Sequence, residues 1–185
     1  MVTEVVQYLE DDVKINKLTA EGLLAGISLD TKFFAFKTGV RTFEAASYLK
    51  KAGADTTEVK KLFRTNVEDF KTKAEIISNT HIIDNRICIS YSKMKSENIN
   101  VVIAQAADEL LTVKNVEASF VLGEKNGIIF ISARSLGKIN VHVLMEKLGG
   151  GGHMDIAGAQ LEGVSIQEAY KKVNYIIEQY LREED

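Results

Sequence analysis

The chain has 185 residues, of which 45% are hydrophobic and 26% charged, a composition typical of a globular protein with one ordinary domain or two small ones. Its net charge of −3 excludes the strongly basic surface that binds long nucleic acid, so any nucleotide ligand is expected to be small. No apolar stretch approaches the roughly 20 residues that cross a bilayer, so we expect this segment to make no direct membrane contact and to lie in the cytoplasm.

The first third of the chain is predicted to be helical. Apolar residues recur at helical spacing from Val2 to Leu9, and the small apolar segment 18–29 indicates a buried helix. Thr42 is expected to cap a helix that ends at Gly53, and Asp55 opens a shorter one. These elements predict a helical subdomain over residues 1–65.

A charged amphipathic segment over residues 66–81 is predicted to be a linker helix, and the pattern changes to strands from residue 82. Strands are expected at 86–91, 118–122 and 128–132, the last two joined by an Asn126-Gly127 turn. A final helix begins at a capping box at Ser165. The expected fold class is α/β, with residues 82–185 forming a compact α/β domain around a mixed sheet.

Four consecutive glycines, Gly149 to Gly152, follow a predicted helix over residues 140–148 and precede His153. Such a run loses much backbone entropy on folding, so it is expected only where positive φ or very close backbone approach is needed, and a ligand is the reason we favour. Successive glycine N–H groups can form a nest for phosphate oxygens, and His153 can donate to a phosphate or pack on a base. A helix cap followed by a surface loop is the alternative.

Polar side chains flank the glycine run. Arg134 and Ser135 end the second hairpin strand, and Asn140 opens the helix that leads to the glycines. A guanidinium, hydroxyls, an amide and an imidazole suit a phosphate that carries a nucleoside. Each residue also has an ordinary role, Arg134 as an exposed strand-end charge, Ser135 as a turn residue and Asn140 as a helix N-cap. Their combination near the glycines favours a binding site.

These motifs resemble a known family. Ser132-Ala133-Arg134-Ser135, Ile139-Asn140-Val141 and Gly149 to His153 are similar to the DHH-associated domain of the DHH phosphoesterase superfamily, whose signature is Gly-Gly-Gly-His. The segments 23–33 and 38–49 resemble the end of the DHH domain in membrane-anchored cyclic-di-AMP phosphodiesterases of the GdpP type. The resemblance covers nearly the whole chain.

The resemblance implies a signalling enzyme that hydrolyses cyclic-di-AMP to linear pApA with two Mn²⁺ ions on its DHH domain. Asp30 matches the last metal-ligand aspartate of that domain. The Asp-His-His triplet is missing, because the histidines stand apart at 81, 142 and 153. We therefore expect a fragment that begins inside the DHH domain and is inactive alone, while the parent protein is membrane-anchored through a missing N-terminal region.

The resemblance assigns two sets of residues. The expected metal ligand is Asp30, and the expected substrate-binding residues are Arg134, Ser135, Asn140, Gly150, Gly151, Gly152 and His153. The expected partner is a cyclic dinucleotide or a short oligonucleotide, and a homodimer remains open. Two alternatives stand: a non-catalytic nucleotide-binding regulatory module, and a relative of the oligoribonucleases and adenosine bisphosphate phosphatases.

Overall fold

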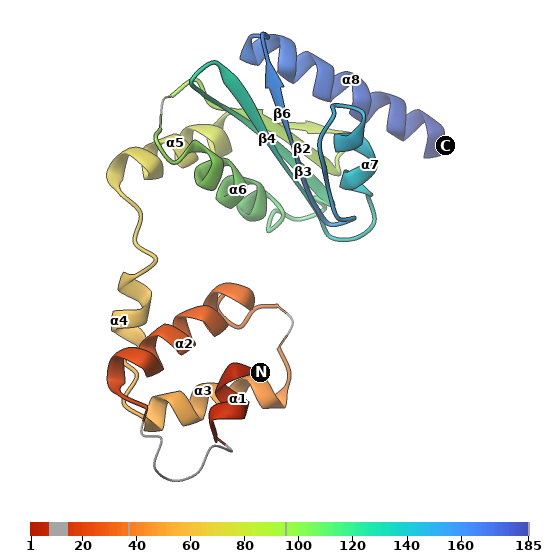
Figure 1. Ribbon diagram of the computed structural model, residues 1–185. Coiled ribbons are helices and arrows are strands. Elements are labelled where there is room, and N and C mark those ends of the chain that lie inside the picture. Colours follow the sequence, from red (N-terminus) through yellow and green to blue (C-terminus); the bar gives the residue numbers. More distant parts are fainter. Residues whose placement is uncertain (8–14, 37, 95, 185) are drawn as a thin grey trace. The chain divides into compact units, whose positions relative to one another are not determined.

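A computed structural model describes residues 1–7, 15–36, 38–94 and 96–184 of the chain (Figure 1). The chain divides into two compact units, Met1–Thr65 and Asn66–Asp185, which we call unit 1 and unit 2. Among the described helices, none is both long and apolar enough to cross a membrane.

Unit 1 is a small helical assembly. Its core consists of apolar side chains from three helices, with Leu24, Leu49 and Val59 at the centre. Gly39, and not Thr42, is the N-cap of the helix that begins at Val40, and the Thr42 hydroxyl accepts a hydrogen bond from the Gly39 N–H at 3.3 Å. The helices of unit 1 are α1 (Val2–Gln7), α2 (Lys17–Asp30), α3 (Val40–Lys51) and α4 (Thr56–Lys61).

Unit 2 is built on a six-stranded sheet in the order β1-β2-β3-β4-β6-β5. Only β2 and β3 run parallel among its described pairs, so the sheet is mixed and the expected α/β class is confirmed. The strands are β1 (His81–Ile83), β2 (Ile87–Tyr91), β3 (Ala118–Lys125), β4 (Ile128–Ser135), β5 (Gly151–Gly152) and β6 (Ile156–Glu162), and the helices are α5 (Val67–Ser78), α6 (Ile99–Leu110), α7 (Val141–Glu146) and α8 (Ile166–Glu184).

The sheet lies between two helical layers (Figure 1). Helices α5 and α6 pack on one face, and α7 and α8 pack on the other. Cys88 is buried under α5 and α6, where burial raises the pKa of its thiol. Helix α5 differs from the predicted linker, because Ile76 is fully buried beside Cys88 and Val102, which makes α5 part of unit 2.

Local sequence signals explain two turns of unit 2. Asn126 and Gly127 have φ values of 55° and 79°, the left-handed pair that a tight hairpin between β3 and β4 requires. At the start of α8, the Ser165 hydroxyl accepts from the Glu168 N–H at 3.3 Å while the Glu168 carboxylate accepts from the Ser165 N–H at 2.8 Å. Both predicted motifs are confirmed.

Candidate functional site

A hollow of about 530 Å³ opens on the face of the sheet that α6 partly covers. Strands β4 and β6 form its floor, the first residues of the glycine run form one side, and α6 forms the other. The residues that line it are Asn100, Ile103, Phe130, Ile131, Ser132, Gly149, Gly150, Ala157, Gly158, Ala159 and Gln160. This volume lies within the range of small-molecule sites.

Strand alternation decides which side chains share this face. Successive residues of a strand point to opposite faces, so Phe130, Ser132 and Arg134 of β4 lie on the side of α6. Their partners across the antiparallel pair in β6 are Gln160, Gly158 and Ile156, respectively. The alternation thus places an aromatic ring, a hydroxyl and a guanidinium in one row, with bare glycine backbone beside the middle position.

The glycine run is fastened to the sheet. Gly151 and Gly152 form β5, which pairs with Gly158 and Ala157 of β6, so these residues are strand residues and not the free phosphate nest that the sequence predicts. A side chain at Gly150 would collide with the Gly158 carbonyl, because β6 passes directly against it. The close backbone approach that four glycines predict is therefore present, and its partner is the protein's own β6.

Two other glycines differ from Gly150 in what surrounds them. A side chain at Gly151 would have no heavy atom within 4 Å, so this position faces open space. Gly149 has a φ of 74°, which ends α7 in the left-handed conformation that favours glycine. Of the three glycines predicted to bind substrate, Gly151 is the one at which an added side chain would not collide with the protein.

Arg134 is not the solvated strand end that its ordinary role predicts. Its side chain is only 14% exposed, and its Nε lies 3.3 Å from the Asp108 carboxylate of α6. Its Nη1 donates to the Ser132 hydroxyl at 2.9 Å and to the Ala133 carbonyl at 3.0 Å. These contacts fix the guanidinium beside Ser132, which lines the hollow, so little side-chain entropy remains to be lost when it meets an anion.

Ser135 lies one position further along β4 and therefore points away from Arg134. Its hydroxyl accepts a hydrogen bond from the Gly137 N–H at 3.0 Å, which is the turn role that the sequence left open. Its backbone N–H donates to the Asp155 carbonyl at 2.9 Å, in the turn between β5 and β6. Ser135 thus helps to hold the turn that carries His153.

Asn140 and His153 lie close to that same turn. The Val141 N–H donates to the Met154 carbonyl at 3.1 Å, which fastens the start of α7 to the turn. Asn140 holds the N-cap position of α7, but its side chain makes no capping bond, and its Oδ1 is buried with no partner among the described residues. The side chain of His153 is exposed, and its N–H donates to the Ile156 carbonyl at 2.7 Å.

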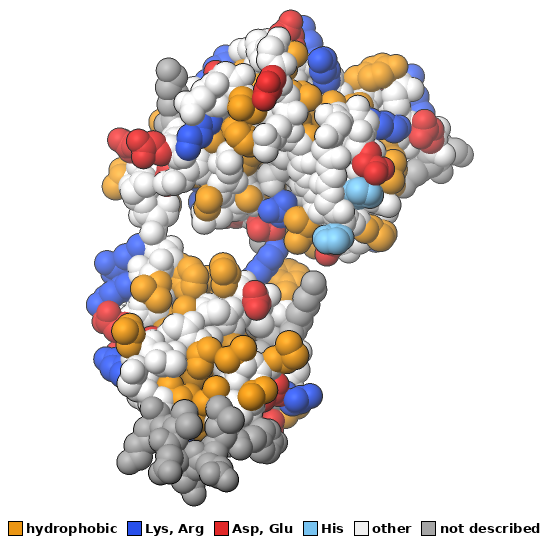
Figure 2. Space-filling view, in the orientation of Figure 1, with side chains coloured by type: hydrophobic (Ala, Val, Ile, Leu, Met, Phe, Trp, Pro, Cys, Tyr) orange, Lys and Arg blue, Asp and Glu red, His pale blue; other side chains and the backbone are white. Residues whose placement is uncertain are grey.

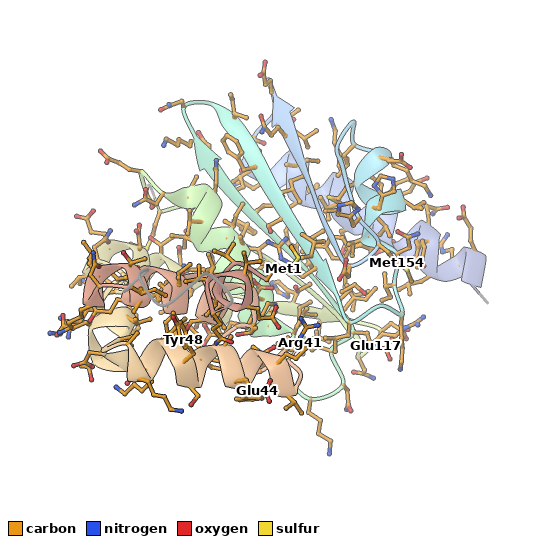
Figure 3. The ribbon with its side chains drawn as sticks, turned by 60° about the horizontal axis from the view of Figure 1, so that its bottom comes forward. Met1, Arg41, Glu44, Tyr48, Glu117 and Met154 are labelled. Atoms are coloured by element: carbon orange, nitrogen blue, oxygen red, sulfur yellow. The ribbon has the colours of Figure 1, made fainter. Side chains whose placement is uncertain are left out.

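The predicted metal ligand lies in unit 1. Asp30 is the exposed last residue of α2 and lines a hollow of about 600 Å³ together with Thr31, Arg41 and Thr42. Arg41 lies on α3, as Figure 3 shows, and its Nε is 2.6 Å from the Glu4 carboxylate. The hollow therefore combines the exposed carboxylate of Asp30 with the guanidinium of Arg41, which is paired with Glu4.

The backbone after Asp30 is unusual. Lys32, Phe33 and Phe34 have φ values of 46°, 56° and 67°, a left-handed run that costs on the order of 1–2 kcal/mol per residue without glycine. The Thr31 side chain holds this turn, because its hydroxyl accepts from the Phe34 N–H at 3.0 Å and donates to the Ile27 carbonyl at 2.7 Å. Strained backbone of this kind concentrates at functional sites.

The described residues of this chain do not build a two-metal centre. Within the described ranges, no three His, Cys, Asp or Glu side chains gather closely enough to bind a metal ion. Asp30 supplies one carboxylate, whereas two hard cations need several oxygen or nitrogen ligands each.

Sequence patterns missed several residues that line the hollow or lie beside it. Asp108 belongs to a predicted helix, and its pairing with Arg134 depends on how α6 crosses β4. Phe130 and Gln160 sit on two strands, and only the register of those strands makes them neighbours. Alternation along β4 is the one signal that could have placed Phe130 on the same face as Arg134.

The chain is similar to curated proteins along nearly its whole length. It is 46% identical to the cyclic-di-AMP phosphodiesterase GdpP of Geobacillus thermodenitrificans over 181 residues, 97% of this chain and 28% of that protein. It is 42% identical to the cyclic-di-AMP phosphodiesterase PdeA of Listeria monocytogenes over 185 residues, 100% of this chain and 28% of that protein. The chain thus spans little more than a quarter of these relatives.

A solved structure shares the fold. An exopolyphosphatase-related protein from Bacteroides fragilis superposes with a TM-score of 0.79 at 23% identity, over 90% of this chain and 51% of that one. The sequence profile of the DHHA1 domain matches residues 84–182, more than half of the chain and most of unit 2. That match confirms the resemblance seen in the glycine run and its flanking strands, and the chain belongs to the DHHA1 domain family.

Proposed function

We propose that this chain is the nucleotide-binding part of a metal-dependent phosphodiesterase that hydrolyses cyclic-di-AMP to linear pApA. The observation behind the proposal is the hollow beside β4 and β6, which Ser132 and glycine backbone line and whose Ser132 hydroxyl accepts a hydrogen bond from the Arg134 guanidinium. The two curated cyclic-di-AMP phosphodiesterases that match almost all of this chain support the choice of ligand.

In this proposal the chain binds and orients the substrate. Arg134 and Ser132 meet one phosphate, and the open position at Gly151 allows the dinucleotide to lie against the backbone. His153 and Asn140 border the same region from the turn that Ser135 fastens. Because the bound molecule is held by fixed groups, its scissile phosphate is presented in one orientation.

Two Mn²⁺ ions would supply the activation of water and the charge neutralisation that phosphodiester cleavage needs. No three His, Cys, Asp or Glu ligands gather among the described residues, and the resemblance assigns Asp30 alone, so we assign the cleavage to parts of the relatives that this chain does not match. We therefore expect this chain to bind cyclic-di-AMP without hydrolysing it.

Isothermal titration of the 185-residue chain with cyclic-di-AMP, cyclic-di-GMP and AMP tests the proposal. We expect cyclic-di-AMP to bind most tightly and its affinity to fall as salt is added, because a charged pair is part of the contact. A parallel assay with added Mn²⁺ should show no hydrolysis. Absence of any heat with cyclic-di-AMP at millimolar concentration, or turnover by the chain alone, would contradict the proposal.

A further inference from the structure

The far end of the hollow has a different chemistry from the end near Arg134. None of the described residues that line the hollow is charged, and the side chains beyond Ser132 are those of Phe130, Gln160, Asn100 and Ile103. One aromatic ring, one aliphatic side chain and two carboxamides therefore stand together. Such a set suits a flat, polar-edged group better than it suits a second phosphate.

Phe130 is held as a rigid platform. The ring is half-buried and packs against the apolar cluster that α5 and α6 form with the sheet, while its remaining surface borders the hollow. Opposite Ser132, Gly158 of β6 carries no side chain, and an added Cβ there would come within 2.9 Å of the Ile131 carbonyl. The floor beside the ring is therefore bare backbone on which a planar group can lie.

The spacing along β4 matches a nucleotide. Residues two apart on a strand are separated by roughly 7 Å, so Phe130 lies about that distance from Ser132 and twice as far from Arg134. A phosphate held by Ser132 and Arg134 thus leaves its own sugar and base over Gly158 and Phe130. The register that pairs Phe130 with Gln160 puts a carboxamide beside that base.

Carboxamides distinguish the two purines. A Gln or Asn side chain presents one donor and one acceptor side by side, which complements the N6–H and N7 edge of adenine, whereas guanine is matched by the paired donors of Arg or Lys. Gln160 and Asn100 are both exposed and both line the hollow, on its β6 and α6 sides. No described residue of this lining is a cation, and Arg134 lies beyond Ser132, so the carboxamides favour adenine.

We propose that Phe130, Gln160 and Asn100 form a nucleobase subsite that selects adenine, with Phe130 as the stacking surface and the two carboxamides as the reading groups. The inference rests on the proposed function, because it assumes that the same hollow holds the phosphate of a cyclic dinucleotide. Gln160 is the specificity-determining residue, and Phe130 contributes affinity for either purine.

Titration of variants with both cyclic dinucleotides tests the subsite. Gln160→Met keeps the length of the side chain and removes the carboxamide, so affinity for cyclic-di-AMP should fall about tenfold while affinity for cyclic-di-GMP stays unchanged. Phe130→Leu should weaken both ligands by roughly tenfold, because stacking is indifferent to base identity. The matched control is Gln105→Met, an exposed carboxamide of α6 that does not line the hollow, and it should change neither affinity.

The outcomes distinguish a failure of the adenine subsite from a failure of the proposed function. If Gln160→Met leaves the ratio of the two affinities unchanged while the native chain still binds cyclic-di-AMP, the adenine subsite is overturned and the proposed function stands. If the native chain binds neither ligand, both fall. Gln160 is exposed on β6, so its variant is expected to fold even where Phe130→Leu disturbs the packing of α6. Far-ultraviolet circular dichroism and the melting temperature check each variant.

Discussion

The two units of the chain differ in how well they bury their own apolar surface. Unit 2 encloses its sheet between two clusters, with large side chains such as Phe120, Ile89 and Leu144 fully buried. In the described part of unit 1, five side chains form the buried core, and three of them belong to Leu24, Leu49 and Val59. A small core of this size gives marginal stability on its own.

Unit 1 also leaves large aromatic side chains exposed. Phe33 and Phe43 are 55% and 54% exposed, and together with Phe34 they line a hollow of about 820 Å³ that is mostly apolar. Figure 2 shows hydrophobic side chains gathered over unit 1. The difference is that unit 2 has a well-buried core, as the proposed binding surface requires, whereas the apolar faces of unit 1 are only partly covered.

The largest expected effect tests where the stability resides. Phe120→Ala empties a fully buried position of β3 and should destabilise unit 2 by about 3–5 kcal/mol. Leu49→Ala in unit 1 removes an equally buried side chain. We expect unit 1 to unfold in a separate, earlier transition, which this second change should abolish while the transition of unit 2 stays in place.

Hydrogen exchange of backbone amides, followed with urea unfolding, measures both effects separately. The amides of α2 and α3 should exchange with a lower opening free energy than those of β3 and β4. A single cooperative transition, shifted equally by either substitution, would show that the two units depend on each other for stability.

The second prediction concerns the guanidinium at the hollow. Arg134→Ala should weaken cyclic-di-AMP binding by about 1.5–3 kcal/mol, because a charge-assisted contact is lost. Arg134→Lys should recover only part of this, since the ammonium keeps the charge and loses the fork. Lys138→Ala is the matched control, because Lys138 is 74% exposed and pairs with Glu117 outside the hollow.

Titration calorimetry of the three variants measures the binding, and the melting temperature separates it from folding. Asp108 is one-third exposed, so leaving it without Arg134 should cost little stability in water. If Arg134→Ala binds cyclic-di-AMP with unchanged affinity, Arg134 does not contact the ligand.

The third prediction compares two neighbouring glycines. Gly150→Ala forces a methyl group against the backbone of β6 and should destabilise unit 2 by about 1–3 kcal/mol. Gly151→Ala meets open space and should change stability by less than about 0.5 kcal/mol. A larger side chain at Gly151 should instead obstruct a ligand, so Gly151→Val is expected to reduce affinity more than stability.

Chemical unfolding of the alanine pair and ligand titration of Gly151→Val provide the measurements. Equal stability loss at both positions would mean that the whole run serves packing. The same comparison corrects a sequence-based expectation, which treated Gly151 and Gly152 alike, although a side chain at Gly152 would collide with the Ile156 carbonyl.

Local signals in the sequence predicted most elements of the fold. Helix periodicity, the Asn126-Gly127 turn and the Ser165 capping box each depend on residues close together in the chain, and the structure confirms them. The short strand β1 was not predicted, because three residues carry too little pattern. The packing of α5 into unit 2 was not predicted because it depends on contacts with residues distant in the sequence, such as Cys88 and Val102.

The candidate site depends on contacts that no local pattern encodes. Arg134 and Asp108 lie on β4 and α6, and their pairing follows from how the helix crosses the sheet. Alternation separates Ser135 from Arg134, a consequence that the sequence motif itself does not reveal. The motif therefore located the region, and the sheet register decided which of its side chains share a face.

The smallest expected effect tests whether α5 belongs to unit 2. Asp69, in the first turn of α5, is 8% exposed and accepts hydrogen bonds from the Ser96 hydroxyl at 2.5 Å, the Asn66 amide at 2.8 Å and the Asn98 amide at 3.1 Å. The bond from Ser96, supported by those from Asn98 and Asn66, lowers the pKa of the Asp69 carboxyl against the opposing effect of burial. This carboxylate ties α5 to the loop between β2 and α6.

A carboxyl whose pKa is lowered by folding adds stability above its unfolded pKa, about 4, and this stability is lost as the pH falls through the folded value. Asp69→Asn should therefore destabilise unit 2 by roughly 1 kcal/mol at neutral pH, and the difference from the native chain should shrink under acid conditions. Glu68→Gln, an exposed carboxyl in the same turn, controls for the helix dipole. Urea unfolding across this pH range is the measurement. If the loss appeared in the unit 1 transition instead, α5 would act as a linker after all, and the boundary between the units would have to move beyond residue 78.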